Sequence, residues 1–187
     1  MHNLIETFRN VGDLSQENEI ALLSAVQRTE CKSKTTLHEL GKICNKIYFV
    51  EKGIARTFYY KDGKDITYWI ALENDFVGAM SSYFMREPSN KMVETIEDCV
   101  LWEFEYQKLE SLFATNQELG KVGRLFANYG MSLMEKRFDN LHFNSAKERY
   151  DILVKQQPEI LQRISLGMIA SYLGVTQETL SRIRTQK

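Results

Sequence analysis

The chain has 187 residues, of which 43% are hydrophobic and 11% aromatic, so it is long and apolar enough to bury a substantial core. Its formal net charge of −1 excludes a uniformly basic chain, and its three cysteines (Cys31, Cys44 and Cys99) form no CxxC pair, which argues against a disulfide framework or a zinc site. No apolar run approaches the length of a membrane span, and Glu6 and Arg9 lie where a signal peptide needs its apolar segment, so we expect a cytoplasmic globular protein.

Two short helices are predicted between Asn3 and Gln27, because apolar residues recur there at helical spacing. Asp13 or Ser15 is placed to cap the second helix, and acidic residues favour its first turn. Nothing in this segment indicates chemistry. The apolar positions are Leu4, Ile5 and Phe8 in the first helix and Ile20, Leu22, Leu23 and Val26 in the second.

Between residues 34 and 104 the pattern changes to that of strands, with β-branched and aromatic residues in short runs. The chain reverses at Lys52-Gly53 and again at Asp62-Gly63, a pair that readily adopts the positive φ values of a tight hairpin. Many short strands at regular spacing predict a closed antiparallel barrel or jelly roll. The expected strands are Ile47 to Val50, Ile54 to Tyr60, Ile66 to Ala71, Met92 to Ile96 and Val100 to Phe104.

A jelly roll is also the scaffold of cupin-type enzymes, which hold a metal with clustered histidines and a carboxylate on neighbouring strands. The histidines here are His2, His38 and His142, and only His38 lies near the expected barrel. The sequence contains no nucleophile elbow, no phosphate loop and no convincing catalytic dyad. We therefore predict that the protein is not an enzyme and holds no metal.

After a short helical segment around residues 106–114, the longest helix is expected from Gln117 to about Leu141. It carries two apolar stripes, one of them with the alternating spacing of three and four residues that is typical of a coiled coil. Either the helix pairs with a second copy, or it is buried within a monomer; the pattern alone fits both. The first stripe is Leu119, Val122, Phe126, Tyr129 and Leu133, and the second is Leu125, Met134, Phe138 and Leu141.

Ser145 to Gln156 is predicted to form a further helix that Ser145 caps and Pro158 ends. The stretch after it, SLGMIASYLGVTQETLSRIR from Ser165 to Arg184, has the spacing of a helix-turn-helix, with Gly174 at the turn. The apolar positions that two short helices would bury together are Ile169, Leu173, Val175, Leu180 and Ile183.

The second of these helices leaves one polar face exposed, and its side chains suit a DNA major groove. Arg pairs with guanine, Gln with adenine and Glu with cytosine, while hydroxyls at a helix N-terminus suit phosphates. An ordinary helical hairpin with a solvated polar face is the alternative. The expected DNA-contacting residues are Thr176, Gln177, Glu178, Thr179, Ser181 and Arg182.

Charge is unevenly distributed along the chain. Residues 143–187 contain seven Lys or Arg, Lys187 included, against four acids, a local balance of +3 that leaves −4 for the remainder. A weakly acidic body with a basic end is compatible with DNA binding by one module. Such a module also favours dimerisation, because two-fold symmetric proteins bind two half-sites one helical turn apart.

The order of these elements, together with the final ASYLGVTQETLSRIR, resembles the Crp/Fnr family, the cyclic-AMP receptor protein and its relatives. The resemblance covers nearly the whole chain. It implies an α+β protein with an effector-type β-roll and N-terminal helices (residues 1–115), a long dimerisation helix (116–142) and a helix-turn-helix domain (143–187). It also implies a homodimeric transcription regulator of palindromic DNA, with RNA polymerase as a further candidate partner. The base-contacting residues would be Gln177, Glu178 and Arg182, the phosphate-contacting ones Thr176 and Thr179, and the dimer interface Val122, Phe126, Tyr129 and Leu133.

The effector pocket departs from the family pattern. Members that bind cyclic AMP carry Gly-Glu after a strand and, about ten residues on, Arg followed by Ser or Thr. Here Gly78 is retained, but Ala79 replaces the glutamate, and Ser89-Asn90 stand where Arg-Ser is expected. The candidate pocket is therefore Gly78, Ala79, Met80, Ser89 and Asn90, with Arg86 and Lys91 as the nearest cations, and we predict that cyclic AMP is not the effector.

Other cofactors of the family are not expected either. Residues 1–30 contain no cysteine for an iron–sulfur cluster, and nothing indicates a haem ligand, so we predict no cofactor. The sequence ends at Lys187, and we expect no β-hairpin wing after the recognition helix. Three alternatives stay open: a sensor with an unidentified ligand in the β-roll, a regulator that binds DNA constitutively, and an interaction module that has lost DNA binding.

Overall fold

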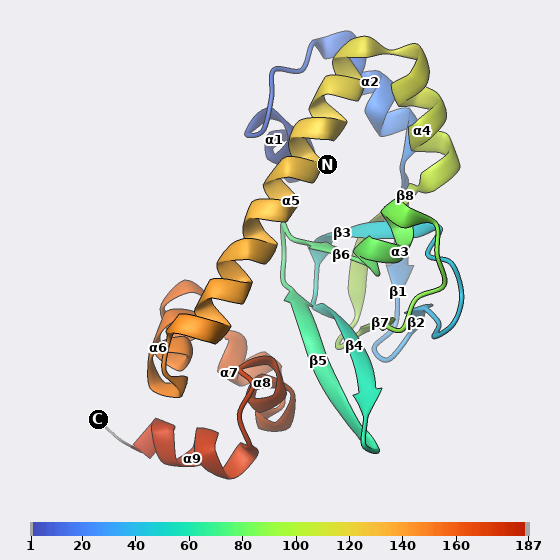
Figure 1. The fold of residues 1–187 in the computed structure, drawn as a ribbon. Coiled ribbons are helices and arrows are strands. Elements are labelled where there is room, and N and C mark those ends of the chain that lie inside the picture. Colours follow the sequence, from blue (N-terminus) through green and yellow to red (C-terminus); the bar gives the residue numbers. More distant parts are fainter. Residues whose placement is uncertain (1, 186–187) are drawn as a thin grey trace.

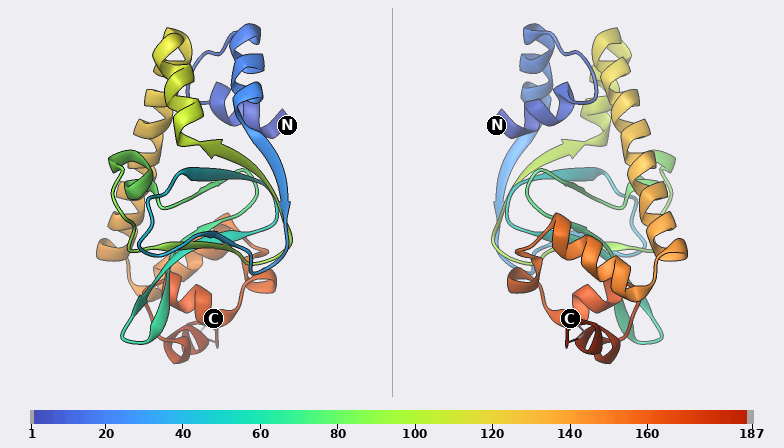
Figure 2. Two further views of the ribbon diagram at one scale, coloured as in Figure 1. Left: turned by 90° about the vertical axis from the view of Figure 1, so that its right-hand side faces the viewer. Right: turned by 90° about the vertical axis from the view of Figure 1, so that its left-hand side faces the viewer.

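The structure, a computed structural model, describes residues 2–185 (Figure 1). A β-roll occupies the middle of the described chain, with one group of helices above it and another below it (Figures 1 and 2). A long helix runs along one side and joins the two groups. None of the helices in this range is long and apolar enough to cross a membrane.

The N-terminal helices, α1 (His2–Arg9) and α2 (Gln16–Ala25), lie at one end of the roll. Of the two predicted cap candidates, Asp13 and Ser15, it is Ser15 that caps α2, since its Oγ accepts the backbone N–H of Asn18 at 3.4 Å. Phe8 of α1 stacks against Phe104 of the roll and Phe126 of the long helix, with ring centroids 5.8 and 5.3 Å apart. These helices therefore close the top of the roll and support the long helix.

The roll consists of two four-stranded antiparallel sheets, which confirms the predicted antiparallel β-roll. Three strands, β1, β2 and β6, were not predicted, because they are short or largely polar. The first sheet has the order β1 (Gln27–Cys31), β8 (Cys99–Glu105), β3 (Lys46–Lys52), β6 (Phe76–Val77), and the second β2 (Thr36–His38), β7 (Met92–Thr95), β4 (Ala55–Lys61), β5 (Lys64–Ala71).

Both predicted reversals are present. Asp62 and Gly63 have φ of 51° and 73° and close the β4–β5 hairpin. Gly53, with φ of 97°, carries the chain from β3 in one sheet to β4 in the other. A Cβ at this position would lie 2.6 Å from the carbonyl oxygen of Asp98, so only glycine fits.

Apolar side chains from both sheets fill the interior of the roll. They form one cluster in which every member is almost fully buried. The interior therefore packs as a core in this structure. Its members are Tyr48, Val50, Ala55, Ala71, Val77, Val93, Cys99 and Leu101.

Three helices follow the strands or connect them: α3 (Met80–Met85), α4 (Tyr106–Thr115) and α5 (Gln117–Phe143). Asn116 caps α5 by accepting the N–H of Leu119 at 3.0 Å. The 27 residues of α5 extend about 40 Å. The helix therefore reaches from the N-terminal helices to the C-terminal end of the molecule (Figure 1).

Four helices form the C-terminal part: α6 (Ala146–Gln156), α7 (Ile160–Arg163), α8 (Leu166–Tyr172) and α9 (Gln177–Thr185). Ser145 and Glu148 make a capping box at the start of α6. Ile54 and Ile70 of the roll belong to the same buried cluster as the apolar side chains of α6 to α9. Ser171 Oγ of α8 also accepts the backbone N–H of Thr67 at 3.1 Å. The C-terminal helices thus dock on the outer face of the β4–β5 hairpin (Figure 2).

An ionic contact reinforces this docking. The guanidinium of Arg163 in α7 pairs bidentately with Glu73, at 2.6 and 2.9 Å, and also with Glu97. Glu73 lies between β5 and β6, and Glu97 between β7 and β8. The hydrogen bonds from Arg163 lower the pKa of Glu73 from its ordinary 4.5 to about 2, although burial opposes the shift.

Replacing Arg163 by glutamine should lower the stability of the folded protein, and the loss should be largest near neutral pH. Because the folded-state pKa of Glu73 lies below its unfolded value, its stabilisation is complete above about pH 4.5 and is lost as the pH falls through 2. We expect the midpoint of thermal unfolding, followed by circular dichroism from pH 7 to pH 2, to fall less steeply with acid in Arg163→Gln. Equal pH profiles for the variant and the original chain would contradict this role for the ion pair.

Candidate functional site

Helices α8 and α9 meet at a tight turn that Gly174 makes possible, with φ of 69° in the left-handed region. The N–H of Val175 donates to the carbonyl of Ala170 at 3.0 Å and closes this turn. Four of the five apolar positions predicted from the spacing are buried, and the fifth, Val175, is half-buried. Ala170, the small residue at the crossing of the helices, is buried as well. The four buried positions are Ile169, Leu173, Leu180 and Ile183.

The opposite side of α9 is polar and open to solvent. Thr176 precedes the helix, and its Oγ1 accepts the N–H of Thr179 at 3.2 Å, which satisfies a free donor of the first turn. Arg182 lies one turn further along and donates to Thr179 Oγ1 at 3.3 Å. The structure thus brings the predicted polar residues onto one helix: Gln177, Glu178, Ser181 and Arg182 are exposed, and Thr179 is half-buried. Lys187 lies outside the described residues.

The start of α9 carries a charged carboxylate beside two cations. A hydrogen bond with Thr176 lowers the pKa of Glu178, and the positive charges of Lys64 and Arg182 act in the same direction. Lys64 belongs to β5, next to the turn of the β4–β5 hairpin. Lys64 therefore adds a positive charge near the helix that the sequence singled out.

The candidate effector residues lie at the start of α3, where Met80 is the first helical residue, and beyond its end. Gly78 passes so close to β3 that an added Cβ would lie 2.6 Å from Ile47 Cγ2, and its carbonyl accepts the hydroxyl of Thr57 at 3.1 Å. Ala79 is fully buried, and Met80 packs partly buried on the same core as α1 and α2. This half of the stretch is enclosed by the protein itself.

The other half, Ser89 and Asn90, follows the C-terminal end of α3. Ser89 is buried, and its hydroxyl accepts the N–H of Lys91 at 2.9 Å and donates to the carbonyl of Lys91 at 3.1 Å. Asn90 is exposed and accepts from the Lys91 ammonium at 3.3 Å. The ammonium of Lys91 also lies 4.7 Å from the centre of the Tyr68 ring. The Ser89 hydroxyl is therefore engaged by the backbone.

Arg86, the other nearby cation, is engaged by groups of its own chain. Its guanidinium donates to the carbonyls of Cys44 and Tyr83 at 2.8 and 3.1 Å and to the side chain of Asn45. It also stacks on the ring of Tyr106, 3.9 Å from the ring centre. Among the residues that the structure describes, no group of three or more His, Cys, Asp or Glu side chains is arranged to hold a metal ion.

The expected dimer seam on α5 needs a correction. Val122 is only 2% exposed and packs in its own chain's core with Leu119, and Phe126 packs edge-to-face on Phe76 with ring centroids 4.5 Å apart. Val122 is therefore enclosed by its own chain and cannot contact a partner, whereas Phe126 is half-buried. Tyr129, 46% exposed, and the half-buried Leu133 are also members of the expected interface that remain accessible.

Arg137 is a candidate functional residue that sequence reasoning missed. It lines an open groove of about 960 Å³ between β5, α5 and α8. The second stripe of α5 had placed Met134, Phe138 and Leu141 on one apolar face, and all three line this groove. The sequence feature that could have indicated Arg137 is its position as the one arginine between Met134 and Phe138 of the apolar stripe.

The sequence of the roll matches a known domain. Residues 28–116 match the family model described as the cyclic nucleotide-binding domain. By sequence and fold, this β-roll is a cyclic nucleotide-binding domain. No curated protein matches the chain in sequence.

Solved structures extend the likeness beyond the cyclic nucleotide-binding domain to the flanking helices. FixK2 from Bradyrhizobium japonicum superposes with a TM-score of 0.71 at 19% identity, over 86% of this chain and 83% of that one. A protein assigned to the Crp/Fnr family of transcriptional regulators from Eubacterium rectale gives 0.67 at 20% identity, over 91% and 82%. The catabolite activator protein of Thermus thermophilus gives 0.57 at 20% identity, over 91% and 82%. The chain therefore has the fold of Crp/Fnr regulators, which confirms the resemblance seen in its sequence.

Proposed function

We propose that the protein is a sequence-specific, DNA-binding transcription regulator of the Crp/Fnr type that works as a homodimer. The observation that carries this proposal is the exposed polar face of α9, presented by a helix whose other face is buried against α8. α8 and α9 would form the helix-turn-helix, with α9 in the major groove. Similar structures that are named as a transcriptional regulator and an activator support this function over an enzymatic one.

The order of residues along α9 fits this task. Thr176 and Thr179 lie at the N-terminal end, where hydroxyls and free N–H groups suit phosphate oxygens. Gln177, Glu178 and Arg182 extend outward with the hydrogen-bonding groups that distinguish adenine, cytosine and guanine. The domain division proposed from the sequence, 1–115, 116–142 and 143–187, assigns DNA contact to the last of these parts.

Dimerisation would proceed through the accessible part of the α5 seam. Tyr129 and Leu133 lie one turn apart, and Phe143, 80% exposed, continues the same side of the helix at the end of α5. Exposed aromatic side chains in a row are typical of a surface that a partner covers. A second copy that packs there would place two α9 helices for two half-sites of a palindromic operator.

Cyclic AMP is not expected to bind. Ala79 and Ser89 replace two charge-assisted contacts, a loss of about 3–6 kcal/mol or a factor of roughly 10²–10⁴ in affinity. Arg86 and the Ser89 hydroxyl are already engaged by backbone groups. Isothermal calorimetry should give no heat of binding at micromolar cyclic AMP. A micromolar dissociation constant would show that the pocket holds the nucleotide by other contacts.

The proposed function is tested by selection from fragmented genomic DNA with the purified full chain, at low and at physiological salt. Enrichment of a palindromic sequence that persists at physiological salt is expected. Phosphate contacts alone weaken steeply as salt rises, whereas base contacts continue to discriminate between sequences. Retention without sequence preference under both conditions would contradict the proposal.

A further inference from the structure

The groove beside α5 has apolar walls that protein side chains leave uncovered. Met131 and Phe138 of α5 line one wall and are 71% and 60% exposed. Tyr59, Ile66 and Tyr68 of the β4–β5 hairpin line the other. The two walls come into contact at Tyr68 and Met134, where the Tyr68 hydroxyl lies 3.9 Å from Met134 Sδ. A volume of about 960 Å³ falls within the range of small-molecule sites.

Arg137 lines this groove at the α8 side. One terminal nitrogen, Nη2, donates to the carbonyl of Tyr172, and the guanidinium stacks on the Tyr172 ring, 3.6 Å from its centre. The other terminal nitrogen, Nη1, is buried and has no hydrogen-bond partner. A buried donor without a partner costs free energy, and more so when it belongs to a charged group. Arg137 therefore has one donor still to be satisfied.

Two other arginines with limited exposure, Arg56 and Arg163, have the carboxylate partners that Arg137 lacks. Arg56 is neutralised by Asp65 and Glu94, and Arg163 by Glu73 and Glu97. Across residues 2–185, no ion pair joins Arg137 to a carboxylate, and burial lowers the pKa of its guanidinium. A buried cation without a counter-ion is unfavourable, so an acceptor with a negative charge would be stabilised beside it.

The balance of charge in the groove favours an anion over a cation. Glu135 is the acidic residue among those lining it, and its side chain is exposed to water, which screens its charge. Arg137 Nη1 is shielded from water, so its charge is screened much less. The hydroxyls of Ser171 and Ser132 also line the groove, but each donates its one hydrogen to a backbone carbonyl of its own helix, at 3.0 Å to Met168 and 2.8 Å to Tyr129. The unpaired donor of the groove is therefore that of Arg137.

We propose that this groove binds a small, largely apolar anion, with an aromatic or aliphatic body between the β4–β5 hairpin and α5 and one carboxylate or phosphate group on Arg137. The site is separate from the stretch around Gly78 and Ser89, none of which lines it. Its walls come from the roll, from α5 and from α8, so the bound molecule stabilises the docked arrangement of the C-terminal helices. Binding is independent of DNA recognition, whereas an effect of the ligand on operator affinity rests on the proposed function.

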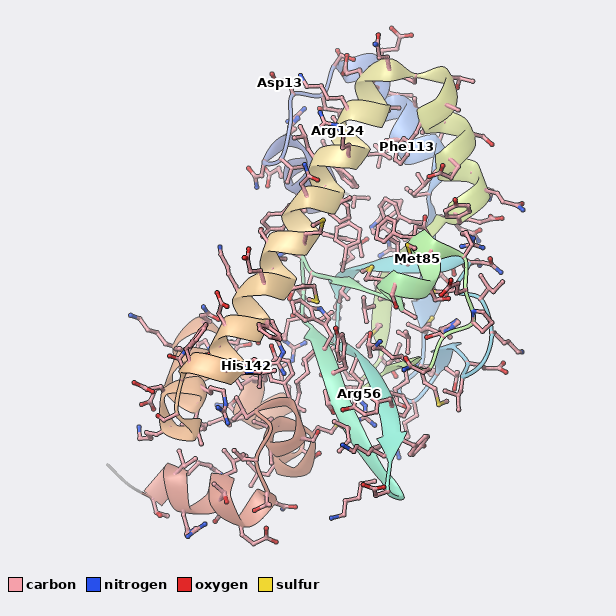
Figure 3. All side chains as sticks on the ribbon, in the orientation of Figure 1. Asp13, Arg56, Met85, Phe113, Arg124 and His142 are labelled. Carbon is pink, nitrogen blue, oxygen red and sulfur yellow. The ribbon has the colours of Figure 1, made fainter. Side chains whose placement is uncertain are left out.

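The test uses 1-anilinonaphthalene-8-sulfonate, an aromatic anion whose fluorescence rises in apolar sites, titrated into the full chain. Arg137→Gln keeps a donor for the Tyr172 carbonyl but loses the charge, and it should weaken binding about tenfold or more. Arg124→Gln is the matched control, since Arg124 is exposed on the same helix (Figure 3) and does not line the groove. Its affinity should equal that of the original chain. Displacement by benzoate or by phenyl phosphate distinguishes a carboxylate from a phosphate ligand.

A second variant covers the case in which Arg137→Gln does not fold. Phe138→Ser changes an exposed groove residue at little cost to folding and should weaken probe binding severalfold. Unchanged affinity in both variants would overturn the proposal, as would the absence of probe binding to the original chain. Probe affinity that falls as protein concentration rises would show that a second copy occupies the groove, which also overturns it. The genomic selection, run without ligand, tests DNA binding separately.

Discussion

Replacing Arg182 by alanine is expected to remove the protein's preference for its operator while leaving its fold and self-association intact. Arg182 is exposed on α9, and its side chain donates to Thr179 Oγ1, so truncation leaves no buried charge unpaired. A lost bidentate contact to guanine costs about 1–3 kcal/mol per half-site. A dimer loses this at both half-sites. Fluorescence anisotropy with the selected operator and a scrambled duplex, at fixed salt, measures the change.

Arg184→Ala is the matched control for this experiment. Arg184 is exposed on the same helix, but at 100° per residue it points about 160° away from Arg182. Its loss should weaken the operator and the scrambled duplex alike, because a cation that meets only phosphates carries no sequence information. If the Arg182→Ala variant prefers the operator over the scrambled duplex as strongly as the original chain does, Arg182 does not contact the bases.

Much of the fold around α9 could be predicted because its causes are local. Gly174 and Thr176 mark the turn and the start of the helix, and the spacing of Leu180 and Ile183 gives its buried face. The caps at Ser15 and Ser145 follow from the same local chemistry. The β4–β5 hairpin was equally clear, because Asp62-Gly63 needs no distant partner to turn.

The parts that failed depend on distant segments. β6 has only two residues and becomes a strand because β3 offers it an edge, pairing Tyr48 with Val77. The sequence pattern places Val122 on an apolar seam, but it does not predict that Val122 packs in one buried cluster with residues of α1. The same holds for the groove, since the unpaired nitrogen of Arg137 arises only when α8 folds back against α5. Sequence periodicity identifies a face but not its partner.

Introducing two charges on the accessible seam, in the double variant Tyr129→Glu and Leu133→Glu, is expected to convert the dimer to a monomer. Two half-sites bound through one dimer gain from effective concentration by about 10²–10⁴, and a monomer loses this gain. Affinity for the full palindrome should fall by that factor, while affinity for a single half-site should stay unchanged. Analytical ultracentrifugation and anisotropy with both duplexes measure the two effects.

Phe138→Glu is the control that decides which face of α5 the partner uses. Phe138 lines the groove, and from Tyr129 it lies nine residues along α5, which is about 180° around the helix. Phe138 is more exposed than Tyr129, so a glutamate at position 138 should destabilise the fold no more than a glutamate at position 129. If the Tyr129 side is the seam, Phe138→Glu remains a dimer and keeps its affinity for the palindrome. If Phe138→Glu dissociates and the double variant does not, the partner covers the groove face instead, and both the seam and the ligand site proposed here are wrong while DNA recognition by α9 stands.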